Sequence, residues 1–194
     1  MKIVIASSNE KKVLEMSSIL KDLGVTMVTA KDCGFFEEVE ETGTTFYENA
    51  RIKSQAVCKA LNMPAIADDS GLCVNALNGR PGVYSARYAP DDFARCTKLM
   101  GELAEKTDTT ASFVSSIVLT MPNGEEIFAN GECFGEIINE MRGDGGFGYD
   151  PIFYVKEYSK TFAELTQEEK NAISHRGKAL REFYAKFKEK NYAN

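Results

Sequence analysis

Two strand-like runs, Ser112 to Met121 and Glu126 to Ile138, are separated only by a turn that contains Pro122-Asn123-Gly124. Asn-Gly between apolar runs is the strongest short-range signal for a β-hairpin. A tight hairpin joins antiparallel strands, so it excludes an all-parallel sheet. At the N-terminus, the strand-like run Lys2 to Ala6 leads directly into a helical pattern. We therefore predict an α/β fold with a mixed sheet.

Periodicity and capping signals predict the remaining elements. Helices are expected from about residue 10 to Gly24, 45 to 61, 91 to 105 and from Thr166 onward, with strands at 25–29, 63–68 and 152–154. The third strand is expected to end at Asp68. No repeat, low-complexity tract or linker interrupts the pattern, so we predict one domain over residues 1–194.

Charge and cysteine usage narrow the classes of function. The net charge is −6 and Lys and Arg form no long run, which argues against a nucleic-acid partner because phosphates usually require a basic face. The five cysteines show no C-x-x-C pair, which is typical of reduced thiols in cytoplasm. We see no signal peptide and no stretch long enough to span a membrane. We expect a soluble cytoplasmic protein.

The segment Ala67-Asp68-Asp69-Ser70-Gly71 places two carboxylates side by side after an apolar run. Like charges this close destabilise each other unless something positive lies beside them. Neighbouring strand residues point to opposite faces, so Asp68 and Asp69 are expected to have different roles. One can be structural, and the other can face a ligand. A turn without a catalytic role is the alternative.

The acidic segment Glu37 to Gly43 is a possible source of a second carboxylate. If it is extended, Glu38 and Glu40 project to one side and Glu37 and Glu41 to the other. Only one side could then meet the aspartates, and two carboxylates from distant segments are a usual way to hold Mg²⁺. The alternative is a solvated acidic face.

The strand-to-helix junction Ser7-Ser8-Asn9 to Lys12 could bind phosphate. A helix start offers free N–H groups and the positive end of the helix dipole, and Lys12 could reach the same anion. The junction lacks the glycines and Gly-Lys-Ser/Thr of a P-loop. Ordinary helix capping is the alternative explanation.

The loop Gly143 to Gly148 formally matches G-x-G-x-x-G, the dinucleotide fingerprint. That fingerprint must open a helix, whereas Tyr149-Asp150-Pro151 follows here and disfavours one. A flexible loop that lays Phe147 or Tyr149 against a flat ligand fits better, and a mobile turn with Phe147 in the core is the alternative. Later in the chain, Lys170, His175 and Arg176 form a compact set of hydrogen-bond donors.

Six stretches together resemble the inosine triphosphate pyrophosphatase family of house-cleaning nucleotide hydrolases. They are SSNEKK, EETGTTFYENA, PAIADDSGL, PGVYSARY, GGFGYDPIF and ELTQEEKNAISHRGKAL, in the family's order from end to end. Ser7-Ser8-Asn9 departs mildly from the Thr-Gly-Asn or Thr-Asn-Asn of many relatives. The resemblance implies an elongated mixed sheet flanked by helices in two lobes around a central cleft. It also implies a homodimer.

The resemblance further implies Mg²⁺-dependent hydrolysis of ITP, dITP, XTP and dXTP to the nucleoside monophosphate and pyrophosphate. Asp69 would be the proton acceptor and a metal ligand, and Glu40 the second metal ligand. The remaining matched residues would bind substrate: Ser7, Ser8, Asn9, Lys12 and Ser70 on the phosphate side, and Phe147, Gly148, Tyr149, Asp150, Lys170, His175 and Arg176 around the nucleoside. Donors such as His175 and Arg176 would favour a 6-oxo purine over adenine.

Two other functions stay open from the sequence. One is a related pyrophosphatase for other modified nucleotides, and the other is a nucleotide-binding module without catalysis. The two acidic residues Asp69 and Glu40 speak against the second.

Overall fold

The computed structural model describes residues 1–190, and the end of the predicted domain, residues 191–194, lies outside this part. Two compact units are distinguished along the chain. Unit 1 comprises Met1–Asp69, Ser115–Gly131 and the chain from Arg176 onward, and unit 2 comprises Ser70–Val114 and Glu132–His175. The single domain and the central cleft both stay predictions.

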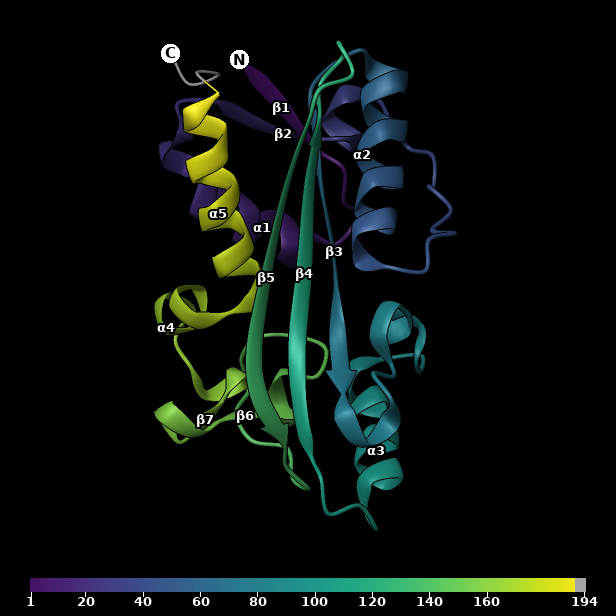
Figure 1. The fold of residues 1–194 in the computed structure, drawn as a ribbon, viewed down its shortest axis with the longest axis vertical. Helices are drawn as coiled ribbons and strands as arrows, with labels where there is room; N and C mark the ends of the chain where they lie inside the picture. Colours follow the sequence, from purple (N-terminus) through teal and green to yellow (C-terminus); the bar gives the residue numbers. More distant parts are fainter. Residues whose placement is uncertain (191–194) are drawn as a thin grey trace. The chain divides into compact units, whose positions relative to one another are not determined.

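Seven strands and five α-helices are present within residues 1–190 (Figure 1). The strands are β1 (Lys2–Ile5), β2 (Thr26–Thr29), β3 (Ala65–Val74), β4 (Thr110–Thr120), β5 (Glu126–Ile137), β6 (Phe153–Val155) and β7 (Lys160–Thr161). The helices are α1 (Glu10–Leu20), α2 (Phe46–Leu61), α3 (Asp92–Leu103), α4 (Gln167–Ile173) and α5 (His175–Glu189).

The sheet has the strand order β2-β1-β3-β4-β5-β6-β7. Its first three strands run parallel to one another, whereas β5, β6 and β7 pair antiparallel. The sheet is therefore mixed, as predicted from the hairpin and the N-terminal strand–helix pair.

The predicted hairpin joins β4 to β5. Gly124 has φ +87° and its N–H donates to the carbonyl of Met121 at 2.9 Å, while the N–H of Met121 donates to the carbonyl of Glu125 at 2.8 Å. A positive φ suits glycine because it has no Cβ. These local signals explain why this turn could be predicted from the sequence.

Helix starts also follow the sequence signals. Asn9 caps α1 by accepting the N–H of Lys12, and Thr45 and Glu48 form the predicted capping box at α2. A second capping box starts α4 at Thr166. Each cap satisfies N–H groups that a helix start otherwise leaves open.

In unit 1, helices cover the parallel strands on both faces of the sheet. Ile3 and Ile5 of β1 pack with residues of α1 and α5, whereas Val4 between them packs with Val57 and Cys58 of α2. Alternate residues of a strand point to opposite faces, so a continuous apolar run such as this one requires cover on both sides.

Unit 2 has a core of its own. Residues from the end of β3, from α3 and from the β6 region pack there, among them Leu72, Leu99, Phe153 and Phe162. The rings of Phe113 and Phe153 lie 4.7 Å apart between centroids.

Within residues 1–190, none of the helices has both the length and the apolar character needed to cross a membrane.

The expectation that the third strand ends at Asp68 is wrong. β3 continues through Asp68 and Asp69 to Val74. The strand that ends near Asp68 is the neighbouring β1, which pairs with β3 only at Val4–Ala65 and Ile5–Ile66. The strand can carry two buried carboxylates in its interior because cations from other segments neutralise them, as the site shows below.

Candidate active site

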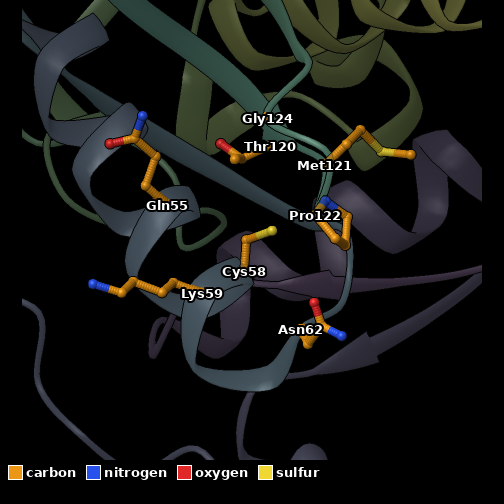
Figure 2. A pocket seen from close by; sticks show the side chains of 8 residues that line it. All are labelled: Gln55, Cys58, Lys59, Asn62, Thr120, Met121, Pro122 and Gly124. Atoms are coloured by element: carbon orange, nitrogen blue, oxygen red, sulfur yellow. The ribbon is translucent and has the colours of Figure 1, made fainter.

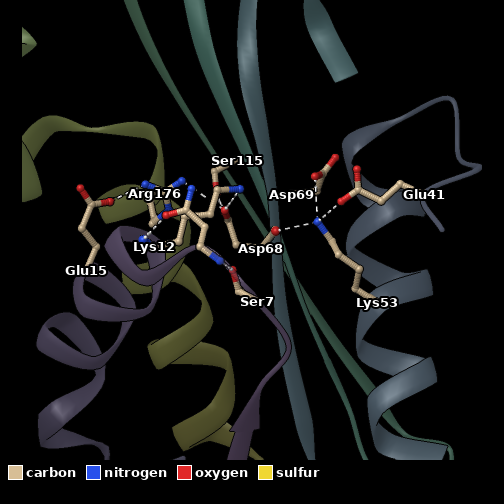
Figure 3. Close-up of polar contacts among 10 residues, drawn as sticks. Ser7, Lys12, Glu15, Glu41, Lys53, Asp68, Asp69, Ser115 and Arg176 are labelled. Carbon is tan, nitrogen blue, oxygen red and sulfur yellow. Dashed lines mark hydrogen bonds and ion pairs between the residues drawn. The ribbon is translucent and has the colours of Figure 1, made fainter. Parts of the chain in front are cut away.

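Asp68 and Asp69 project to opposite sides of β3, as their alternation predicts (Figure 3). Asp68 is 1% exposed, and its Oδ2 lies 2.8 Å from Lys12 Nζ and 3.1 Å from Arg176 Nη2. Its Oδ1 accepts a hydrogen bond from the Ser115 hydroxyl. Burial opposes ionisation, but Arg176 and Lys12 outweigh it and hold the pKa of Asp68 well below its usual range. Asp68 is therefore a charged anchor at neutral pH.

Asp69 has a different environment. Its Oδ1 accepts a hydrogen bond from Lys53 Nζ at 2.9 Å, whereas its buried Oδ2 has no hydrogen-bond partner within residues 1–190. Burial raises the pKa of Asp69 above its ordinary value, and Lys53 offsets only part of this rise. A half-satisfied carboxylate of raised basicity can accept a proton or bind a cation through Oδ2.

Lys12 lies in the first turn of α1, and its side chain is largely buried. Burial lowers its pKa, and Asp68 compensates only in part because Arg176 and Lys53 repel the ammonium group. Lys12 is therefore a cation with too little negative charge around it. A polyanion placed against it would complete its compensation.

The other predicted phosphate contacts lie at the same junction. The Ser7 hydroxyl accepts a hydrogen bond from the N–H of Asn9 at 3.2 Å, and Ser8 is exposed. Asn9 Oδ1 is occupied as the helix cap. Ser70 is half-buried and directly follows Asp69 on β3.

Glu41, rather than Glu40, is the acidic-segment residue that the structure brings to Asp69. Glu41 Oε1 lies 2.7 Å from Lys53 Nζ, which also binds Asp69 (Figure 3). Glu40 is exposed and forms no hydrogen bond or ion pair within residues 1–190. The metal-binding role of Glu40 stays a prediction, and Glu41 is a further candidate.

The donor set at Asp69 fits a hard divalent cation. No cluster of three or more His, Cys, Asp or Glu residues suited to a metal occurs in the described residues. Mg²⁺ commonly uses one or two carboxylates and completes its shell with water and substrate phosphates. The free Oδ2 of Asp69 and the nearby Glu41 could supply those carboxylates.

Arg176 is buried in unit 1 at 1% exposed. Its Nη1 pairs with Glu15 and its Nη2 with Asp68. Burial opposes its charge, but Asp68 and Glu15 outweigh this and raise its pKa. Both terminal nitrogens are thus used by carboxylates, and the predicted contact of Arg176 with the base stays a prediction.

The glycine-rich loop of unit 2 presents one aromatic side chain and buries the other. Phe147 is half-buried, whereas Tyr149 is 3% exposed and its hydroxyl donates to the carbonyl of Ser85 at 2.9 Å. Of the two aromatics predicted to meet a flat ligand, Phe147 is therefore the less buried. The N–H of Gly148 donates to Asp92 Oδ2 at 2.8 Å, which attaches the loop to α3.

A buried ion pair shapes this loop. Asp150 Oδ2 accepts hydrogen bonds from Lys170 Nζ and from the N–H of Phe147, both at 2.8 Å. Gly146 has φ +72°, and an added Cβ would collide with the Asp150 carboxylate. Lys170 Nζ also lies 4.9 Å from the centroid of the Phe147 ring, a cation–π distance. Asp150 thus fixes both the loop backbone and the lysine.

His175 stacks on the aromatic core of unit 2. Its ring lies 4.8 Å from that of Phe113 and 6.4 Å from that of Phe162, nearly parallel to both. It is 5% exposed. The aromatic stack therefore holds the imidazole ring in the interior of unit 2, and the predicted contact of His175 with the nucleoside stays a prediction.

A hollow of about 410 Å³ lies elsewhere in unit 1, between α2 and the β4–β5 hairpin (Figure 2). It is lined by Gln55, Cys58, Lys59, Asn62, Thr120, Met121, Pro122 and Gly124. None of the predicted site residues lines it.

Comparison with known proteins finds relatives over almost the whole chain, and the sequence profile described as Ham1 family matches residues 3–186. The chain belongs to the Ham1 family. Among Ham1 relatives, it is 50% identical over 186 residues to a dITP/XTP pyrophosphatase of Desulfotalea psychrophila, covering 94% of this chain and 83% of the relative. It is 46% identical over 194 residues to a protein of the same name from Bacillus anthracis, covering 96% of each chain.

Solved Ham1 structures agree with the fold. The Staphylococcus aureus Ham1 protein is 44% identical, with a TM-score of 0.89 over 98% of this chain and 100% of that one. A HAM1 protein of Coxiella burnetii, also 44% identical, has a TM-score of 0.90 over 97% and 99% of the two chains. The resemblance to a family of nucleotide pyrophosphatases and the α/β mixed sheet are both confirmed.

Sequence reasoning missed several residues of the site. Lys53, Glu41 and Glu15 were not singled out, although each forms an ion pair with a predicted residue or its partner. A weak signal existed for Lys53, because the capping box fixes the register of α2 and so the face on which Lys53 lies. Nothing local signals Glu15, whose partner is distant in the sequence.

Proposed function

We propose that this Ham1 protein hydrolyses deaminated purine nucleoside triphosphates, ITP, dITP, XTP and dXTP, to the monophosphate and pyrophosphate with Mg²⁺ as cofactor. The names of relatives at 46–50% identity over nearly the whole chain support the substrate class. The observation that carries the chemistry is the Asp69 carboxylate: Lys53 holds its Oδ1, and its buried Oδ2 has no hydrogen-bond partner in the described part of the chain.

In this proposal, Asp69 accepts the proton of the attacking water through Oδ2, and Lys53 fixes the orientation of the carboxylate. Burial raises the pKa of Asp69 in the metal-free protein, and Oδ2 is the oxygen that Lys53 leaves available for the proton. Mg²⁺, held by Asp69 with Glu40 or Glu41, would neutralise phosphate charge and lower the pKa of a bound water.

Lys12 and the N-terminus of α1 bind the phosphates in this proposal. The under-compensated charge of Lys12 favours a polyanion, and preorganised positive groups stabilise the charge that develops on the leaving pyrophosphate. The 2.8 Å ion pair with Asp68 fixes the position of the Lys12 ammonium group.

Residues of unit 2 recognise the nucleoside. Phe147 offers a ring for stacking on the base, and Lys170 and Asp150 supply a donor and an acceptor beside it. A pocket built to hydrogen-bond a 6-oxo purine rejects an analogue whose amino group meets another donor.

The other parts of the proposal come from the sequence. They are a homodimer in the cytoplasm without a nucleic-acid partner, and sedimentation of the purified protein would check the dimer.

The test is pyrophosphate release from dITP, XTP, dGTP and dATP, each with Mg²⁺ and with EDTA. We expect rapid release from dITP and XTP with Mg²⁺ only. D69N should lower kcat by about 10³-fold while the melting temperature changes little, since the amide oxygen of an asparagine can still accept the hydrogen bond from Lys53. Equal turnover of dATP and dITP, turnover in EDTA or an active D69N variant would each contradict part of the proposal.

A further inference from the structure

Asn49 lies in the first turn of α2 and is 0% exposed. Its Oδ1 accepts a hydrogen bond from the backbone N–H of Gly43 at 2.8 Å, whereas its Nδ2 has no hydrogen-bond partner within residues 1–190. A buried donor without a partner lowers stability. Stability alone therefore does not account for an asparagine at this position.

The first turn of α2 binds three consecutive backbone amides. Glu48 Oε2 accepts the N–H of Thr44 at 2.7 Å and that of Thr45 at 3.0 Å, and Asn49 takes the N–H of Gly43 that precedes them. The backbone is thereby fixed up to two residues after Glu41.

Asn49 and Lys53 are four residues apart, so they share one face of α2. Lys53 Nζ holds the Glu41 carboxylate at 2.7 Å and Asp69 Oδ1 at 2.9 Å. One face of the helix thus attaches the acidic segment at two points, at the side chain of Glu41 and at the backbone of Gly43.

Gly43 is fitted closely to this attachment. A Cβ added there would lie 2.6 Å from Glu48 Cβ and 2.7 Å from Asn49 Oδ1. Any side chain at Gly43 would push the acidic segment away from α2, so the Asn49–Gly43 contact can be broken from either partner.

We propose that Asn49 is a positioning residue that fixes the acidic segment Glu40–Gly43 so that its carboxylates can bind a divalent cation with Asp69. This inference rests on the Mg²⁺-dependent function proposed above. Mg²⁺ demands near-ideal coordination geometry, and groups that orient metal ligands typically change metal affinity by about 10- to 100-fold when they are removed. A carboxylate on a loop meets that demand only if the loop backbone is held.

The first experiment needs neither metal nor substrate. Hydrogen exchange of the Gly43 amide, followed by NMR in metal-free protein, should be about tenfold faster in N49A than in the parent, because the hydrogen bond to Asn49 is lost. N49D is isosteric and keeps an acceptor oxygen, so it should restore slow exchange. T45A is the matched control, because it removes the α2 cap but leaves Gly43 and Asn49 unchanged.

The second experiment measures cation binding directly. Mn²⁺ is titrated into the metal-free protein and its free concentration is followed by EPR. The dissociation constant should rise about tenfold in N49A, and G43A should reproduce this rise from the other side of the contact. T45A should stay within twofold of the parent.

The outcomes separate two failures. A parent that binds no Mn²⁺ would overturn this inference, whereas pyrophosphate release that persists in EDTA would overturn the metal-dependent function. A parent that binds Mn²⁺, with N49A equal to it or T45A weakened as much as N49A, would overturn only the role of Asn49. If N49A does not fold, G43A and the Gly43 exchange rate in N49D decide the same question.

Discussion

Around Asp68 and Asp69, unit 1 gathers charged side chains from separate stretches of the chain, whereas the glycine-rich loop of unit 2 places the ion pair Asp150–Lys170 against aromatic rings. In unit 1 the carboxylates and cations share partners, so each group changes the pKa of its neighbours. In unit 2 the ion pair instead fixes the loop backbone at Phe147 and lies beside its ring. On the proposed function, we therefore predict that changes in unit 1 alter catalysis and stability for every substrate, and that changes in unit 2 alter which substrate binds.

The largest effect that sharpens this comparison is expected at Asp68. D68N removes the charge that compensates buried Lys12 and Arg176, so the free energy of unfolding should fall by about 3–5 kcal/mol at pH 7. Because the folded-state pKa of Asp68 is depressed, its contribution is present above the unfolded pKa of about 3.9 and is lost as the pH falls toward the folded value.

Urea unfolding of the parent and D68N between pH 7 and pH 3 measures this. The gap between the two proteins should be constant down to about pH 4 and should shrink below it. D144N, in the exposed loop of unit 2, is the control and should match the parent. A gap that does not change with pH would mean that Asp68 is not the charged anchor of unit 1.

An intermediate effect is expected at Phe147. F147A removes the ring proposed to stack on the base, so KM for dITP should rise by about 5- to 150-fold, which corresponds to a stacking energy of about 1–3 kcal/mol. Turnover at saturation should change little, because the loss is one of binding. Steady-state kinetics measures both constants.

F134A is the matched control for F147A, since Phe134 is a 71% exposed phenylalanine of the same unit. It should leave KM unchanged. If F147A instead lowers kcat alone, the division between a catalytic unit 1 and a binding unit 2 would break down.

The smallest effect is expected at Tyr149. Y149F deletes the hydroxyl that donates to the Ser85 carbonyl, so the protein should lose about 1 kcal/mol of stability. KM for dITP should stay within twofold, because the ring is buried and Phe147 faces the ligand in the proposal. Thermal unfolding and kinetics on the same preparation test this, and a large rise in KM would reverse the roles of the two aromatics.

Features set by local physics were readable from the sequence. The hairpin at Gly124 and the capping boxes at Thr45 and Thr166 depend on residues a few positions apart, and all three are present. The alternation that separates Asp68 from Asp69 is equally local, and it too was predicted correctly.

Features that depend on distant partners were not readable. The continuation of β3 past Asp68 requires Lys12 and Arg176 to neutralise that carboxylate, and they lie far from it in the sequence. The choice between Glu40 and Glu41 depends on which side of the acidic segment meets Lys53. Neither periodicity nor composition encodes such a contact.

The double use of Asp150 has a consequence for anyone who wishes to retarget this protein to another base. One oxygen of Asp150 binds both the lysine and the loop backbone, and a side chain at Gly146 would collide with this carboxylate. Altering that carboxylate would therefore remove the hydrogen bonds that hold the loop backbone and Lys170 together. Engineering is better begun at Phe147, because its ring can be exchanged while the Asp150 carboxylate still accepts the backbone N–H of this residue.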